Sequence, residues 1–306
     1  PVVCLMGARA TGKTDLAVWL HEQGPFDIIS VDSAMVYRGM DIGTAKPTPA
    51  LQQQVPHGLL DVRDPDDPYS AAEFAKDARV LIAHSHAAGR IPLLVGGTRL
   101  YFSALLNGLS ALPSADSVTR DAIDAEAASE GWVALHQQLA RVDPETAARL
   151  HPNDAQRIQR ALEVYRLTGQ PLSALQSQTT REQNPWHLVK MGIAAADRQR
   201  LYKKIATRFE SMLDAGLVDE VKGLQAKHRL DPDMPSMRAV GYRQVWEYLA
   251  LGFTKDELWF RGVAATRQLA RRQLTWLRRE GDVHWLDAGD GAMQKQCRQY
   301  LSGMLG

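Results

Sequence analysis

The sequence predicts an α/β fold, with a parallel sheet core flanked by helices, an all-helical insertion and a helical C-terminal region. Three observations predict this fold. Short apolar runs alternate with helical patterns over roughly the first hundred residues, which is typical of a parallel sheet covered on both faces. A glycine-rich turn with a lysine separates the first apolar run from the first helical pattern. The alternation stops after residue 111, and only helical patterns follow to residue 180.

The individual elements follow from local patterns. Apolar runs of strand length predict strands at Val2–Met6, Phe26–Val31, Ile91–Val95, His187–Ala195 and Val283–Leu286. A helical pattern follows the first strand at Lys13–Glu22. Ser70 and Glu73 form a capping box, Ser-x-x-Glu, which predicts a helix that begins there and ends near Ala88.

The interruption of the pattern predicts two domains. We expect residues 1–111 and 181–306 to form the core domain, and residues 112–180 to form an inserted helical domain. One helix of the insertion is predicted to end at Thr168-Gly169-Gln170-Pro171. Its apolar residues recur at helical spacing: Ala155, Ile158, Leu162 and Tyr165.

Composition and charge predict an ordinary globular protein. Hydrophobic residues make up 45% of the 306 residues and charged residues 23%, with a net charge of +1. No apolar run reaches the length of about eighteen residues that suggests a membrane span, and no secretion leader precedes the first motif. Cys4 and Cys297 are too few and too far apart for a disulfide framework or a zinc site. We therefore expect a cytoplasmic monomer with no membrane or protein partner.

A phosphate-binding sequence lies at the first strand–helix junction. It matches the P-loop pattern G-x-x-x-x-G-K-[ST] with Gly7, Ala8, Arg9, Ala10, Thr11, Gly12, Lys13 and Thr14. The glycines let backbone N–H groups turn toward an anion, and the helix N-terminus adds partial positive charge. We expect Lys13 to reach the outer phosphate and the Thr14 hydroxyl to ligate Mg²⁺. The pattern predicts a P-loop-type core that binds a diphosphate or a triphosphate.

The acid that nucleotide-hydrolysing P-loop proteins carry on a core strand is missing from its expected place. The third strand ends Leu94-Val95-Gly96-Gly97-Thr98, with no carboxylate. Asp32 follows the second strand and is the acid nearest the loop by strand order. From the residues alone, Asp32 either holds a metal or acts as a base.

Further stretches resemble the tRNA dimethylallyltransferase family. The most specific is residues 32–47, which reads Asp-Ser-Ala-Met-Val-Tyr-Arg-Gly-Met-Asp-Ile-Gly-Thr-Ala-Lys-Pro. The others are Gly96-Gly97-Thr98-Arg99-Leu100-Tyr101, Gln156-Arg157-Ile158-Gln159-Arg160, Arg238-Ala239-Val240-Gly241-Tyr242-Arg243 and the helix segment Arg267–Trp276. These matches follow the family's order and cover nearly the whole chain.

The resemblance implies an activity. A dimethylallyl group would pass from dimethylallyl diphosphate to the exocyclic N6 of the adenine 3′ to the anticodon, in tRNAs that read codons beginning with U, and diphosphate would be released. The implied partner is the tRNA anticodon stem-loop, from which the adenine is flipped. Two positions depart from the family, which usually has Pro and Thr where this chain has Ala8 and Arg9. Arg9 is expected to add a cation beside the diphosphate. The zinc finger of the eukaryotic relatives is excluded by the two isolated cysteines, so the resemblance is to the bacterial form.

The resemblance also implies three catalytic roles. Asp32 would be the general base that takes a proton from the adenine amine, Thr98 would touch the departing diphosphate oxygen, and Arg208 would lie against the diphosphate. Arg208 falls in a predicted helix, Asp197–Ala215. The alternatives are a Mg²⁺-positioning carboxylate for Asp32, a hydroxyl bonded to backbone for Thr98, and a helix-surface side chain for Arg208.

The residues expected to contact tRNA are spread along the chain. By resemblance they are Asp32, Ser33, Ala34, Met35, Thr98, Arg120, Gln156, Arg157, Ile158, Gln159, Arg160, Arg238, Gly241, Tyr242, Arg243, Arg267, Arg271 and Arg278. The residues themselves support the last group, because the helix expected over 261–279 has arginines but no acids. At about 100° per residue its arginines fall on one side: Arg261, Arg267, Arg271, Arg272, Arg278 and Arg279. Surface helices usually mix charges, so this cationic strip favours RNA binding over a solvated face.

Three other functions share parts of this pattern. An ATP-dependent small-molecule kinase would have the same loop and core, but it would not need the helical insertion or the arginines. An isopentenyltransferase acting on free adenine nucleotides would share Asp32 and Thr98 without the arginine helix. A non-catalytic RNA-binding protein would need neither Lys13 nor Asp32.

Overall fold

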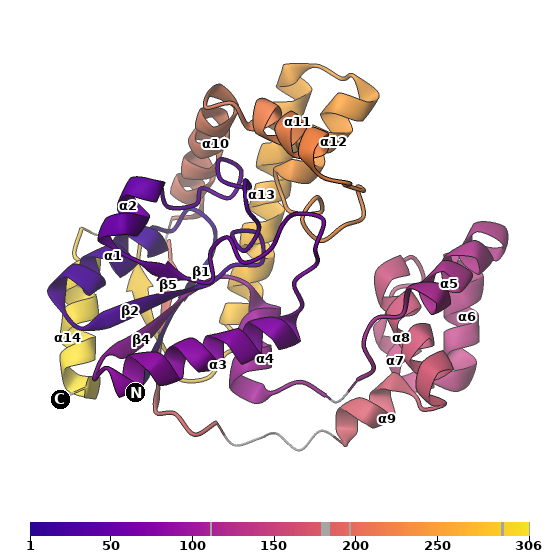
Figure 1. Cartoon of the computed structure of the whole chain (residues 1–306), viewed down its shortest axis with the longest axis horizontal. Coiled ribbons are helices and arrows are strands. Elements are labelled where there is room, and N and C mark those ends of the chain that lie inside the picture. Colours follow the sequence, from indigo (N-terminus) through magenta and orange to yellow (C-terminus); the bar gives the residue numbers. More distant parts are fainter. Residues whose placement is uncertain (111, 179–183, 196, 289–290, 306) are drawn as a thin grey trace. The chain divides into compact units, whose positions relative to one another are not determined.

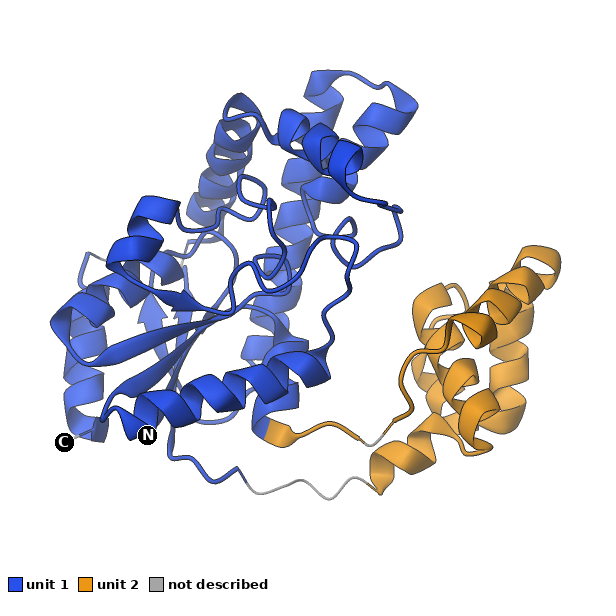
Figure 2. Ribbon diagram, viewed as in Figure 1, with its two compact units in different colours: residues 1–106, 184–306 blue, residues 107–183 orange. Residues whose placement is uncertain are grey.

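Two compact units make up the chain. The computed structural model describes residues 1–110, 112–178, 184–195, 197–288 and 291–305 (Figure 1). Residues 1–106 and 184–306 form the first unit, and residues 107–183 form the second (Figure 2). The insertion predicted over residues 112–180 lies within the second unit.

The first unit is built on a parallel sheet, which confirms the predicted α/β core. Its described strands are ordered β3-β2-β4-β1-β5-β6, and each neighbouring pair is parallel. The strands are β1 (Val2–Gly7), β2 (Phe26–Val31), β3 (His57–Gly58), β4 (Ile91–Gly96), β5 (Leu188–Ala194) and β6 (Val283–Asp287). The five predicted strands are present within one or two residues of their expected ends, and β3 is the addition.

Helices account for most of the remaining first unit. They are α1 (Lys13–Gln23), α2 (Pro49–Gln54), α3 (Ala71–Ala87), α4 (Arg99–Asn107), α10 (Arg198–Asp214), α11 (Leu217–Lys227), α12 (Tyr242–Leu251), α13 (Lys255–Leu277) and α14 (Met293–Leu305). The predicted capping box begins α3, since the Ser70 hydroxyl accepts from the Glu73 N–H and the Glu73 carboxylate accepts from the Ser70 N–H. The helix expected to reach Arg279 ends at Leu277, so Arg278 and Arg279 follow its last turn.

Both faces of the sheet are covered by helices (Figure 1). Side chains of β1 alternate between the faces: Val3 and Leu5 pack in a cluster with α1 and α14, while Val2 and Cys4 pack in the cluster that includes α3 and α4. Because β1, β2 and β4 are parallel and in register, the loops that follow them emerge at one edge of the sheet. That edge carries the P-loop, Asp32 and Thr98.

The second unit is entirely helical among its described residues. Its helices are α5 (Ser117–Glu130), α6 (Trp132–Val142), α7 (Pro144–Arg149), α8 (Ala155–Thr168) and α9 (Leu172–Ser177). Their apolar faces meet in a separate core that includes Ile123, Leu135 and Ile158. Helix α8 ends at Thr168 and is capped by Gly169, whose φ of 69° is the left-handed conformation expected of a glycine at this position.

Two further predictions concern the surroundings of the protein. Among the described residues, no helix combines the length and apolarity that crossing a membrane requires. Cys4 and Cys297 are both free thiols buried in the core.

Candidate active site

The P-loop connects β1 to α1 in a tight turn. Ala10 and Gly12 both have positive φ, 65° and 86°, and the turn is closed by a hydrogen bond of 2.8 Å from the Thr11 hydroxyl to the Ala8 carbonyl. Lys13 is the first residue of α1, and its ammonium donates to the same carbonyl at 2.7 Å. The helix N-terminus and the Lys13 ammonium therefore place positive charge at one spot.

The loop is unusually crowded with cations. Burial lowers the pKa of Lys13 to about 8; the Asp32 carboxylate opposes this shift, and the nearby Arg208 and Arg9 add to it. Burial likewise lowers the pKa of Arg208, which lies on α10, and Arg9 contributes to that shift. Mutual repulsion among Lys13, Arg9 and Arg208 would be relieved by a polyanion, so this is a site for several phosphate charges.

Asp32 is held in place by the loop that follows β2. Its Oδ1 accepts hydrogen bonds from the N–H groups of Ala34 at 2.8 Å and Met35 at 3.3 Å. Thr98, directly after Gly97, accepts the Ser33 N–H on its hydroxyl oxygen at 3.1 Å, so it links the ends of β2 and β4. The backbone-bonded alternative for Thr98 is therefore present in the structure, although Thr98 also lines a cavity.

The Gly96-Gly97 pair is explained by close packing of the two strand ends. A Cβ added at Gly96 would lie 2.0 Å from the Val31 carbonyl oxygen, and one at Gly97 would lie 2.8 Å from the Gly7 carbonyl oxygen. Residues with side chains would push apart β2, β4 and the P-loop. These glycines therefore keep Asp32 close to Lys13.

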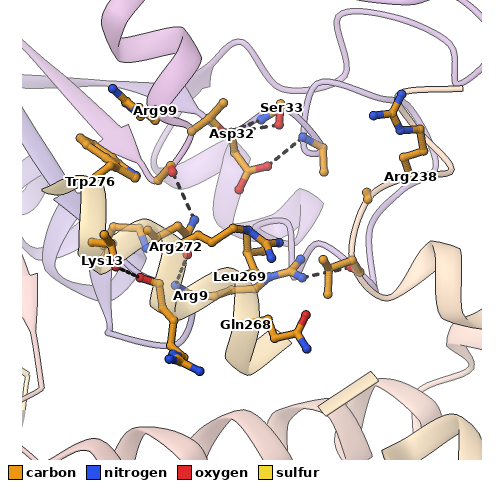
Figure 3. Close-up of a pocket in the computed structure, with 18 of the residues that line it drawn as sticks. Arg9, Lys13, Asp32, Ser33, Arg99, Arg238, Gln268, Leu269, Arg272 and Trp276 are labelled. Carbon is orange, nitrogen blue, oxygen red and sulfur yellow. Dashed lines mark hydrogen bonds between the residues drawn. The ribbon is translucent and has the colours of Figure 1, made fainter. Parts of the chain in front are cut away.

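Two cavities share Arg9, Lys13 and Asp32 as part of their walls. The larger has a volume of about 1020 Å³ and is lined by Thr98 and a set of arginines, with Asp32 the one acid among its described lining residues (Figure 3). Those arginines are Arg9, Arg99, Arg238, Arg271, Arg272 and Arg279.

The smaller cavity, of about 370 Å³, is lined by the P-loop segment from Arg9 to Thr14, by Asp15 and by Arg208. Its other lining residues are mixed: Ile28, Met35, Ala45, Pro47, Leu51, Leu60 and Val95 are apolar, whereas Ser30, Thr44, Lys46, Thr48 and His57 are polar. One cavity thus suits a phosphate with an apolar tail, and the other suits a nucleic acid strand.

Comparison with known proteins agrees with this geometry. The sequence profile of the IPP transferase family matches residues 35–280. A tRNA dimethylallyltransferase of Alkalilimnicola ehrlichii is 55% identical over 307 residues, covering 99% of this chain and 96% of that protein. The chain belongs to the tRNA dimethylallyltransferase family. A tRNA dimethylallyltransferase of Thiobacillus denitrificans is 53% identical over 306 residues, covering 100% of this chain and 97% of that protein.

Solved structures of the family share the fold. The tRNA isopentenylpyrophosphate transferase of Bacillus halodurans is 37% identical with a TM-score of 0.72, covering 99% of this chain and 96% of that one. The enzyme of Staphylococcus epidermidis is 31% identical with a TM-score of 0.69, covering 100% and 99%. A eukaryotic dimethylallyltransferase acting on tRNA, 24% identical, has a TM-score of 0.78 over 97% of this chain and 77% of that one, and this likeness concerns the fold alone.

The six arginines of the predicted cationic strip do not all present their charge on one surface. Arg271 and Arg272 line the larger cavity. Arg261 instead donates to Glu257 at 2.7 Å and lies over the Phe253 ring, so its charge is matched within its own surroundings. Arg267 packs over the ring of Tyr202, with 5.0 Å between the guanidinium and the ring centroid.

Several lining residues were not in the predicted site, and three of them bear on its chemistry. Arg99, Gln273 and Trp276 all line the larger cavity. Gln273 joins two parts of the site, because it accepts the Arg9 N–H at 2.9 Å and donates to the Gly97 carbonyl at 3.2 Å. Arg99, Gln273 and Trp276 fall within the stretches that resemble the family, which was the signal that could have found them.

The stretch Arg238–Arg243, predicted to contact RNA, divides into two kinds of residue. Arg238 lines the larger cavity, and Arg243 is exposed beside Glu247, to which it donates at 3.0 Å. Tyr242 is fully buried and its hydroxyl donates to Glu220, so its predicted RNA contact is replaced by a packing role. Gly241 has a φ of 101° and precedes α12, where it sets the turn.

The predicted RNA residues of the insertion also differ among themselves. Ile158 is fully buried in the core of the second unit, so its side chain cannot reach RNA, and this prediction was wrong. Arg120 and Arg160 both donate to the buried carboxylate of Glu163. Among the exposed members, Gln156 and Arg157 face solvent on α8.

Proposed function

We propose that this chain transfers the dimethylallyl group of dimethylallyl diphosphate to the N6 of the adenine 3′ to the anticodon in tRNAs that read codons beginning with U. One observation carries the proposal: Lys13 and Asp32 line both a phosphate-binding, partly apolar cavity and a large cationic cavity. A transferase needs its two substrates to meet at one pair of residues. Membership in the family makes tRNA adenine prenylation the activity, and the details below belong to the proposal.

The diphosphate occupies the smaller cavity in this proposal. Its charges fit the P-loop N–H groups and the cations Lys13 and Arg208. The five-carbon group lies against the apolar wall that includes Ile28, Leu51 and Val95. A diphosphate carrying a short hydrocarbon matches a cavity that has both cationic and apolar lining residues.

The adenine enters from the larger cavity, whose arginines suit the phosphates of a flipped nucleotide. Asp32 then acts as general base. The N6 lone pair forms a bond to C1 of the dimethylallyl group, the C1–oxygen bond breaks with its electron pair leaving on diphosphate, and the N6 proton passes to Asp32. The Asp32 side chain suits this role because Oδ1 is held by two backbone N–H groups while the carboxylate lines both cavities.

Arg208 and Thr98 complete the proposed machinery. Arg208, half-buried beside the P-loop, stabilises the charge that develops on the departing diphosphate. The Thr98 oxygen accepts from the Ser33 N–H, and its hydroxyl donates to Ser33 Oγ at 3.4 Å. Thr98 lines the larger cavity, and its contact with the departing oxygen rests on the family resemblance. Since Ser33 follows Asp32, Thr98 also positions the base.

Mg²⁺ is the proposed cofactor. Thr14 lines the smaller cavity beside the P-loop, and no cluster of three or more His, Cys, Asp or Glu side chains that could hold a metal occurs in the described part of the chain. This donor set fits Mg²⁺, which binds through one or two protein oxygens together with substrate phosphates and water. When bound, the ion neutralises diphosphate charge. EDTA is expected to abolish transfer and added Mg²⁺ to restore it.

The tRNA anticodon stem-loop is the proposed partner, and the remaining tRNA contacts follow the resemblance. They are Ser33, Ala34 and Met35 beside the base, Arg238, Arg243, Arg267, Arg271 and Arg278 in the first unit, and Arg120, Gln156, Arg157, Gln159 and Arg160 in the insertion. We also propose a cytoplasmic location, which the free cysteines support, and a monomer without a protein partner. Light scattering of the purified protein tests the oligomeric state.

One assay tests the proposed function. The protein is incubated with labelled dimethylallyl diphosphate and, separately, with tRNA, AMP or ATP. Label should enter tRNA alone, and nuclease digestion should place it on the adenine 3′ to the anticodon. Label in AMP would favour the free-nucleotide isopentenyltransferase, and no label in any acceptor would reject the proposal.

A further inference from the structure

Arg9 occupies the third position of the P-loop, where it was expected to bind the diphosphate. Its guanidinium is instead engaged with two main-chain carbonyls. Nη1 donates to the Val240 carbonyl at 3.1 Å, and Nη2 donates to the Gly43 carbonyl at 2.8 Å. Val240 lies 231 residues after Arg9 in the chain, and Gly43 lies 34 residues after it. The planar fork of the guanidinium therefore holds together three segments that are distant in sequence.

Gly43 is fixed from both sides. Its carbonyl accepts from Arg9, while the N–H groups of Asp41, Ile42 and Gly43 donate to the Glu220 carboxylate at 3.1, 2.7 and 3.3 Å. A Cβ at Gly43 would lie 2.5 Å from the Tyr242 ring, so the loop packs directly on that ring.

The connection closes on itself through Tyr242. Its hydroxyl donates to the same Glu220 carboxylate, and the side chain is fully buried. Val240, which Arg9 holds, lies two residues before Tyr242. Arg9, Gly43, Glu220 and the segment 240–242 thus form a closed network at one end of the P-loop.

This network ends at the wall of the larger cavity. Arg238, Ala239 and Val240 all line that cavity, on the side that the proposed function assigns to tRNA. The Arg9 main chain is held as well, because its N–H donates to Gln273 of α13 at 2.9 Å. Movement of the P-loop at Arg9 would therefore be transmitted to the tRNA side of the site, whereas Lys13 and Thr14 lie at the other end of the loop.

We propose that Arg9 is a positioning residue that fixes the tRNA-facing segment 238–240 to the P-loop, and that it is not a ligand of the diphosphate. The inference rests on the proposed function, because it assigns the two cavities to the two substrates. Arg9 stands where the family usually has Thr, so this role is specific to chains that carry an arginine there. Substitution should affect the use of tRNA and leave the use of diphosphate nearly unchanged.

The test uses Arg9→Met, which removes charge and hydrogen bonds, and Arg9→Lys, which keeps the charge but loses the fork. Arg90→Lys is the matched control, because Arg90 also donates to a main-chain carbonyl, that of Phe26 at 3.0 Å, at the other end of the sheet. Steady-state transfer is measured while tRNA and dimethylallyl diphosphate are titrated separately. Melting temperatures of all variants are measured in parallel.

For Arg9→Met we expect kcat/KM for tRNA to fall on the order of 100-fold, and for Arg9→Lys on the order of tenfold, since each lost hydrogen bond involves a charged donor. KM for dimethylallyl diphosphate should stay within about threefold of wild type. Arg90→Lys should change neither parameter, even where its melting temperature falls.

Other outcomes overturn the inference. A raised diphosphate KM in Arg9→Met that Arg9→Lys restores, with tRNA kinetics unchanged, would make Arg9 a charge ligand. A lowered melting temperature with unchanged tRNA kinetics would leave Arg9 a purely structural role. If Arg9→Met does not fold, Arg9→Lys decides alone. An inactive wild-type protein would refute the proposed function itself and is recognised before any variant is compared.

Discussion

The Lys13 ammonium donates a hydrogen bond to the main-chain carbonyl of Ala8 at 2.7 Å, within its own P-loop. The contact stabilises a cation that burial and the neighbouring Arg208 and Arg9 make costly, and the pKa of Lys13 is lowered to about 8. An incoming diphosphate offers the ammonium a far stronger partner. The protonation of Lys13 should therefore control diphosphate binding.

We predict that affinity for dimethylallyl diphosphate falls as pH rises through about 8. Below that value Lys13 is charged before the ligand arrives; above it, binding must first protonate the amine, so the dissociation constant should rise about tenfold per pH unit. Isothermal titration from about pH 7 to about pH 10 measures the slope. Lys13→Arg, which stays protonated over this range, should show a much flatter profile. Equal slopes in the two proteins would show that another group titrates.

We predict that Asp32→Asn retains tRNA binding and loses turnover. The amide oxygen can still accept from the N–H groups of Ala34 and Met35, so the loop should persist, while the base is lost. Single-turnover transfer should slow by about 10²–10⁴-fold. Asp27→Asn is the control, because Asp27 lies at the opposite end of β2 in a salt bridge with Arg90. Single-turnover rates close to wild type in Asp32→Asn would remove Asp32 from the role of general base.

Most of the core and part of the site could be predicted from the sequence. Strands β1, β2 and β4 were predictable because each is a continuous apolar run, and parallel strands bring their following loops to one edge. Strand β3 has two residues and no periodic pattern, so no local sequence pattern predicts it. The partners of Arg9 could not be predicted, since hydrogen bonds across 231 residues depend on the folded packing.

Charge on α13 illustrates a signal that was present but not used. Arg261 was counted in the cationic strip, yet Glu257 stands four residues before it on the same helix and binds it. A periodic sequence of arginines predicts a face, but the neighbours in the folded chain decide how much charge that face presents. Ile158 makes the same point, because a residue within an RNA-contact motif can belong to the core.

We predict that replacing Arg271 and Arg278 together with Ala weakens tRNA binding and flattens its salt dependence. Both side chains are exposed, and each phosphate contact that is lost removes about one unit of counterion release from the slope. Arg261→Ala is the control on the same helix, because Glu257 already neutralises it. Filter binding over a salt titration measures both quantities, and binding of the diphosphate should not change. An unaltered slope in the double variant would exclude these arginines from the tRNA interface.

We predict that Glu163→Gln destabilises the second unit. Glu163 is fully buried and accepts hydrogen bonds from the Asp116 N–H, Arg120 and Arg160. Burial alone would raise the pKa of Glu163, but these hydrogen bonds outweigh burial and lower it. Each hydrogen bond to a charged group contributes about 1.5–3 kcal/mol, and the amide weakens those that Arg120 and Arg160 donate. Because the folded pKa is depressed, the stabilisation is present above the unfolded pKa of about 4.3 and is lost as pH falls.

Hydrogen exchange of α5 and α8 in the full chain measures this effect. Glu126→Gln is the matched control, because Glu126 also joins α5 to α8 through Arg166 but is partly exposed, where ion pairs contribute about 0.2–1 kcal/mol. Exchange in the sheet of the first unit should be unchanged. Equal protection of α5 and α8 in the two variants would show that the buried carboxylate does not hold these helices together.

The last prediction is that the P-loop serves the isoprenoid diphosphate and not ATP. Strand β4 is the neighbour of β1 and ends at Gly96, where a Cβ would lie 2.0 Å from the Val31 carbonyl oxygen, so an acid cannot stand there. The nearby carboxylate, Asp32, lies between two cavities and suits a base. Lys13→Ala should therefore lose dimethylallyl transfer by orders of magnitude.

The purified protein should also hydrolyse no ATP, with or without tRNA, and transfer should proceed with ATP absent. In the proposed site, Lys13, Arg208 and the loop N–H groups would stabilise the leaving diphosphate. The transferred carbon is allylic, so its positive charge is delocalised and no phosphoryl activation is needed. The measurement compares phosphate release and transfer in the same preparation. Two outcomes would contradict this prediction: ATP hydrolysis that tRNA stimulates and that Lys13→Ala abolishes, or transfer that requires ATP. Either would show that the loop binds ATP and would favour the kinase.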